Sequence, residues 1–98
     1  MASAKFELGR IVITPGALGA LEEAQQNALH FLALHASGRW GDLDREDRAA
    51  NDRAIAHEGD REQQDRVLSA YQTRLGAKLW VITEWDRSVT TILLPGEY

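Results

Sequence analysis

Residues 78–85 read Lys78-Leu79-Trp80-Val81-Ile82-Thr83-Glu84-Trp85. Two sets of residues alternate along this run, with the period of two that is typical of a β-strand: Leu79, Val81, Thr83 and Trp85, and Trp80, Ile82 and Glu84. Both sets contain large apolar residues, so we expect a strand that is covered on both faces. Trp80 is the tryptophan that we expect in the core.

Two further β-rich runs flank this strand, at residues 66–73 and 89–94. The breaks between the runs, residues 74–77 and 86–88, have the length and turn chemistry of hairpins. The last third therefore predicts a three-stranded antiparallel meander, which ends at Pro95. If its terminal strand, Val89 to Leu94, is an uncovered edge, two copies could pair through it in a dimer; alternatively, a strand predicted at residues 6–14 could join the meander.

The first half is predicted to contain one strand, at residues 6–14, and three helices. The helices are expected at residues 15–24, where Thr14 can cap and Pro15 fits the first turn, at 26–37 and at 44–58. Residues 60–65 either extend the third helix or form an exposed linker. We predict an α+β fold over residues 1–98 as a single domain, with an N-terminal strand and about three helices packed on the C-terminal three-stranded meander.

Composition limits the class of protein. The chain has 98 residues, 44% hydrophobic and 27% charged, and no cysteine, which fits a packed domain in a reducing compartment. No run is long and apolar enough for a membrane span or a signal peptide. We therefore expect a soluble, cytoplasmic protein.

The net charge of −4 arises within residues 42–66, which hold nine acidic residues and five arginines. No cluster of Lys and Arg provides the basic face that nucleic-acid binders usually show. Binding to nucleic acid is therefore not favoured.

Histidine spacing does not predict a metal site. His30 and His35 are five residues apart, whereas a pair on one helix face prefers four. We expect no metal and no cofactor. His35 is interpreted as a helix-terminal residue that caps carbonyls or lies half exposed; the alternative is a general base tuned by the helix end.

Polar residues of the predicted sheet suggest a second chemistry. A metal-independent ribonuclease needs a base for the 2′-hydroxyl and a cation for the phosphate, and His35, Glu84 and Arg87 could supply these groups as catalytic residues. The alternative is that Glu84 and Arg87 only solvate an exposed hairpin.

Two tryptophans are candidates for a protein interface, because exposed tryptophans often anchor such contacts. Trp40 lies in a glycine-flanked loop and Trp85 lies beside a turn. Arg39 and Asp42 flank Trp40 and complete this candidate binding surface. Trp40 could equally fold over the core of its own domain.

Several segments resemble a family of short bacterial proteins carried on plasmids and integrative elements, commonly labelled "plasmid-related" or hypothetical. The resemblance covers nearly the whole chain, and its distinctive segments are His35-Ala36-Ser37-Gly38-Arg39-Trp40-Gly41-Asp42-Leu43, Trp80-Val81-Ile82-Thr83-Glu84 and Asp86-Arg87-Ser88-Val89-Thr90-Thr91-Ile92-Leu93-Leu94-Pro95-Gly96-Glu97-Tyr98. It implies no catalytic residues. It does imply a mobile genetic element, and with it a factor in host defence or plasmid maintenance, or a toxin-like nuclease.

The leading hypothesis is therefore a small non-enzymatic accessory protein that binds another protein. The competing hypothesis is the metal-independent ribonuclease, and a DNA-binding regulator comes third because no basic recognition helix is present.

Overall fold

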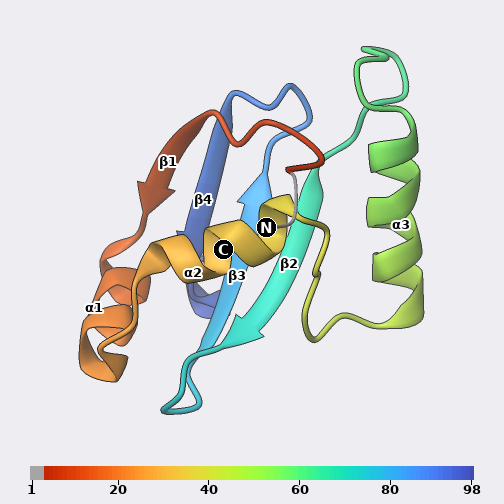
Figure 1. The fold of residues 1–98 in the computed structure, drawn as a ribbon. Coiled ribbons are helices and arrows are strands. Elements are labelled where there is room, and N and C mark those ends of the chain that lie inside the picture. The colour runs from red at the N-terminus through yellow and green to blue at the C-terminus, as the bar shows by residue number, and fades with distance from the viewer. Residues whose placement is uncertain (1–3) are drawn as a thin grey trace.

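The computed structural model describes residues 4–98. It contains three helices, a mixed four-stranded sheet and a final 3-10 turn, which confirms the predicted α+β fold (Figure 1). The elements are β1 (Arg10–Ile13), α1 (Pro15–Ala24), α2 (Ala28–Ala36), α3 (Arg45–Ala56), β2 (Val67–Gln72), β3 (Lys78–Thr83), β4 (Val89–Leu93) and η1 (Pro95–Glu97).

Local capping chemistry sets the helix boundaries. The Thr14 side chain accepts a hydrogen bond from the Ala17 amide, as predicted, and Asp44 caps α3 by accepting one from the Asp47 amide. Helix α2 is shorter than expected because Asn27 caps it. Residues 60–65 do not extend α3 but form turns and irregular structure.

The first strand changes the predicted edge of the sheet. The strand order is β1-β4-β3-β2, and β1 pairs in parallel with β4 from Arg10↔Val89 to Ile13↔Ile92. Val89 to Leu94 is therefore not an uncovered edge, and the alternative that the first strand joins the meander is confirmed. Gly9 lets the chain approach β4, because a Cβ there would lie 2.4 Å from the Arg87 carbonyl oxygen.

The main core lies between one face of the sheet and the helices. Figure 1 shows α2 crossing this face, with α1 near β1 and α3 standing beside β2. The buried members of this core are Ala17, Leu21, Phe31, Leu32, Tyr71, Leu79, Val81 and Ile92. A second cluster joins α3 to the N-terminal segment and comprises Phe6, Trp40, Ala54 and Val67.

The outer edge of β2 is closed by groups from outside the sheet. The Ala70 amide donates to the Trp40 carbonyl (3.0 Å), and the Asp42 amide donates to the Ala70 carbonyl (2.7 Å). The Asn51 side chain bonds both backbone groups of Leu68. These bonds satisfy polar groups that an edge strand would otherwise present to another chain.

Among residues 4–98, none of the helices has the length and apolar composition required to cross a bilayer.

Candidate functional site

Among residues 4–98, no α-helix packs over the second face of the sheet (Figure 1). Side chains alternate along a strand, so the residues between the buried core positions point away from α2. The strand residues on this surface, which we call the open sheet face, are Arg10, Val12, Leu68, Ala70, Gln72, Lys78, Trp80, Ile82, Val89, Thr91 and Leu93. Most are half-buried or exposed, although Ile82 and Leu93 are buried.

The C-terminal residues cover part of the open sheet face. The Tyr98 ring meets the Trp80 ring edge-on, with 5.8 Å between centroids, and its hydroxyl accepts a hydrogen bond from Arg66 (2.6 Å). Tyr98 itself stays 70% exposed. These contacts hold Trp80 on the outer face, so the prediction that Trp80 belongs to the core is wrong.

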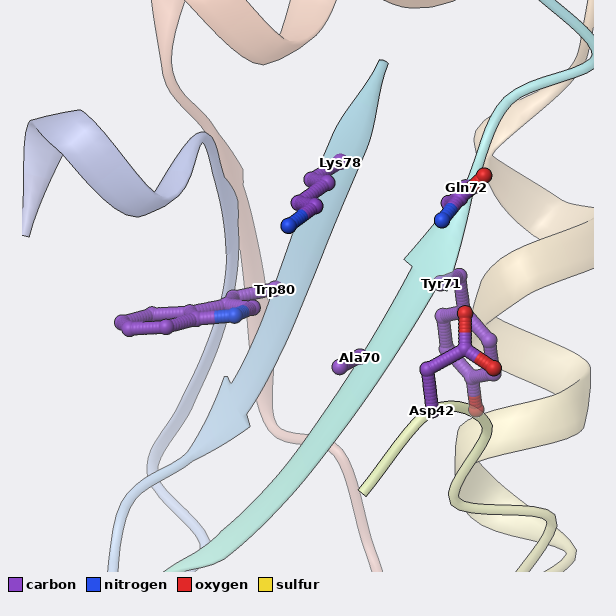
Figure 2. Close-up of a pocket in the computed structure, with 6 residues that line it drawn as sticks. All are labelled: Asp42, Ala70, Tyr71, Gln72, Lys78 and Trp80. Carbon is purple, nitrogen blue, oxygen red and sulfur yellow. The ribbon is translucent and has the colours of Figure 1, made fainter. Parts of the chain in front are cut away.

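A hollow of about 350 Å³ opens beside Trp80 (Figure 2). Its lining consists of Asp42, Ala70, Tyr71, Gln72, Lys78 and Trp80. Ala70 is the cross-strand neighbour of Trp80, and its small side chain leaves the space that a larger residue would fill. Figure 2 shows Trp80 extending to one side while Asp42 lies beyond the outer edge of β2.

Asp42 is held at this position by its neighbours. Gly41 has φ +77°, and a Cβ there would lie 2.0 Å from the Ala70 carbonyl oxygen, so only glycine lets the loop reach β2. From α3, Arg48 donates to the carbonyls of Gly41 (2.6 Å) and Leu43 (3.0 Å). The loop therefore presents Asp42 from a fixed backbone.

Tyr71 offers the hollow little hydrogen-bonding capacity. Its hydroxyl donates to the Arg39 carbonyl (2.6 Å), and burial raises the pKa of Tyr71 to about 12. The polar chemistry of the hollow thus comes from the other lining residues: Lys78, Gln72 and Asp42.

The charges that border the hollow have opposite signs. Lys78 belongs to β3 and Asp42 to the loop beside β2, with Ala70 and Gln72 between them (Figure 2). Within residues 4–98, neither charged side chain forms an ion pair; the ion pair found there joins Arg87 and Glu58. Both side chains are exposed.

His35 lies in the interior of the molecule. It is 0% exposed, so the interpretation as a half-exposed or carbonyl-capping residue is wrong. Its Nδ1 lies 2.5 Å from the Ser69 hydroxyl and its Nε2 lies 2.9 Å from the Thr83 hydroxyl. Burial, and secondarily the charge of Arg87, lower the pKa of His35 to about 3.

The hydrogen-bond chain beyond His35 fixes its tautomer. Thr90 donates to the Leu8 carbonyl (2.6 Å), so it accepts from Thr83, which lies 2.6 Å away. Because the Thr83 hydroxyl donates its proton to Thr90, it must accept a hydrogen bond from the Nε2–H group of His35. The Nδ1 atom of His35 then carries no proton and accepts a hydrogen bond from the Ser69 hydroxyl. His35 is a neutral structural residue whose hydrogen-bond capacity is satisfied.

The other two residues of the ribonuclease hypothesis do not share a solvent-facing site with His35. Arg87 is 7% exposed; it pairs with Glu58 (2.7 Å) and donates to the carbonyls of Asp65 and Glu84. Glu84 is exposed at the turn that follows β3. The ribonuclease hypothesis stays a prediction, but these residues do not assemble the surface that it requires.

The predicted interface residues are divided between the interior and the surface. Trp40 is 5% exposed: it stacks on Phe6, and its indole N–H donates to Asp52 (3.2 Å). Trp85 is 45% exposed beside the β3–β4 turn. Arg39 is exposed, and of this set Asp42 lines the hollow.

Sequence reasoning missed Trp80, Lys78 and Gln72 as site residues. Strand alternation places Lys78 and Trp80 on the same face, and a lysine there is a signal that the face reaches solvent. Gln72 joins them because the antiparallel register pairs it with Lys78, and that register depends on the exact hairpin geometry.

Comparisons of the chain with protein-family models, curated proteins and solved structures gave no match. The fold and the candidate site by themselves define the class of this protein as an α+β domain with an open sheet face. Within the described residues, no group of three or more His, Cys, Asp or Glu side chains could hold a metal ion.

Proposed function

We propose that this protein is a non-enzymatic accessory protein that binds a protein partner through the open sheet face. The observation that carries the proposal is the hollow beside Trp80, where half-buried apolar residues of the open sheet face meet polar residues at its edge. Such surfaces, with an aromatic residue near the centre and polar groups at the rim, are typical of protein interfaces.

The composition of the face supports a protein rather than a nucleic acid. Single-stranded nucleic acid binds where aromatic residues stack successive bases along a basic groove. Six of the eleven residues of the open sheet face are aliphatic instead, among them the half-buried Val12, Leu68 and Val89. The resemblance to proteins of mobile genetic elements supports a cytoplasmic role in host defence or plasmid maintenance.

The test is complex formation by variants of the tagged chain, expressed in its host and purified with nuclease treatment. Trp80→Lys places a charge at the centre of the open sheet face and is expected to abolish a stoichiometric protein complex. Leu29→Lys is the matched control, because Leu29 is 67% exposed on α2, outside the open sheet face. Loss of the complex in both variants, or in neither, contradicts the proposal.

A further inference from the structure

The charges beside the hollow are complementary to each other. Lys78 and Asp42 stand on different sides of the hollow, exposed and without ion-pair partners among residues 4–98. A surface that carries opposite charges on the two sides of a hollow matches itself when one copy is turned over onto another. A two-fold axis lying between two facing sheets and passing over the hollow brings each Asp42 opposite Lys78 of the second copy.

We propose that the occupant of the open sheet face is a second copy of this chain, which forms a symmetric face-to-face dimer. This inference rests on the proposed function, since it names the partner for the same surface. Packing two sheets face to face buries the apolar residues of both and leaves the helices outside, as in a β-sandwich. The two Asp42–Lys78 pairs then set the orientation of the copies.

The edges of the sheet favour a face-to-face arrangement. The outer edge of β2 is closed by residues 40–42 and by Asn51, so it offers few free backbone groups to another strand. The β1 edge is only four residues long. The open sheet face presents more residues than either edge, and Lys78 on this face and Asp42 at its border carry opposite charges.

The experiment reverses the charge of Asp42 in one variant and of Lys78 in another. Sedimentation over a concentration series measures how strongly each variant dimerises. In Asp42→Lys, each contact between copies becomes Lys against Lys; in Lys78→Asp, it becomes Asp against Asp. Because like charges at an interface repel strongly, each variant alone is expected to dimerise at least about 100-fold more weakly than the wild type. When the variants are mixed in equal amounts, every contact joins Lys to Asp, and dimers are expected to return.

The outcomes separate this inference from the proposed function. A wild-type dimer, two monomeric variants and recovery on mixing support the inference; melting temperatures near that of the wild type confirm that both variants are folded. A wild type that is monomeric throughout, or dimers that survive both single changes, overturn it. If the wild type is monomeric yet Trp80→Lys still abolishes a complex with a different protein, the face binds that protein instead of a second copy.

Discussion

His35 contributes to stability in its neutral form. Above pH 6.5 both the folded and the unfolded chain hold it uncharged. As pH falls from 6.5 towards about 3, the unfolded chain takes up a proton that the folded state excludes. The free energy of unfolding therefore decreases over this window by about 1.4 kcal/mol for each pH unit from this group alone.

The change His35→Gln tests this account. Glutamine can accept from Ser69 and donate to Thr83 but does not titrate, so the variant is expected to lose less stability than the wild type between pH 7 and pH 4.5. Urea unfolding at the two pH values measures the difference, and His30→Gln is the control because His30 is exposed. Equal pH dependence in the wild type and His35→Gln contradicts the buried neutral assignment.

At the scale of elements, residues 40–42 form an isolated parallel bridge to β2 at Ala70. They satisfy the backbone of Ala70 and position Asp42 at the hollow, and this geometry depends on Gly41. The loop thus links the closure of the sheet edge to the shape of the candidate site.

Gly41→Ala is expected to lower the free energy of unfolding by roughly 2–4 kcal/mol, since it combines a left-handed backbone with a clash against β2. Gly76→Ala is the control: Gly76 has φ +88° but open space around its Cβ position, so about 1 kcal/mol is expected. Chemical denaturation measures both values, and hydrogen exchange should show faster exchange of the Ala70 amide in Gly41→Ala alone. Similar losses in the two variants would rule out the clash as the cause.

The accuracy of sequence-based prediction differed between local and long-range features. Helix α1 was predicted at its observed bounds because Thr14 and Pro15 are local signals. The parallel pairing of β1 with β4 and the buried chain at His35 join residues far apart in the sequence, and no local pattern encodes them. Asp42 was identified as a candidate, whereas Trp80 was assigned to the core because alternation does not reveal which face the helices cover.

At the scale of the whole molecule, the chain separates a helix-covered face from an open one. The interior polar groups are satisfied: His35 by hydroxyls and Arg87 by Glu58 and backbone carbonyls. On the open sheet face, the hollow beside Trp80 adjoins the half-buried apolar residues of the sheet. We therefore propose that a partner binds at the open sheet face.

The most direct test of this claim is photo-crosslinking in the host cell. A photoreactive phenylalanine derivative replaces either Thr91, on the open sheet face, or Leu29, on the exposed side of α2. The account predicts a defined protein adduct from position 91 and none from position 29, with the adduct mass distinguishing a second copy from another protein. Adducts from position 29 alone, or none from position 91 in a folded, abundant variant, would contradict it.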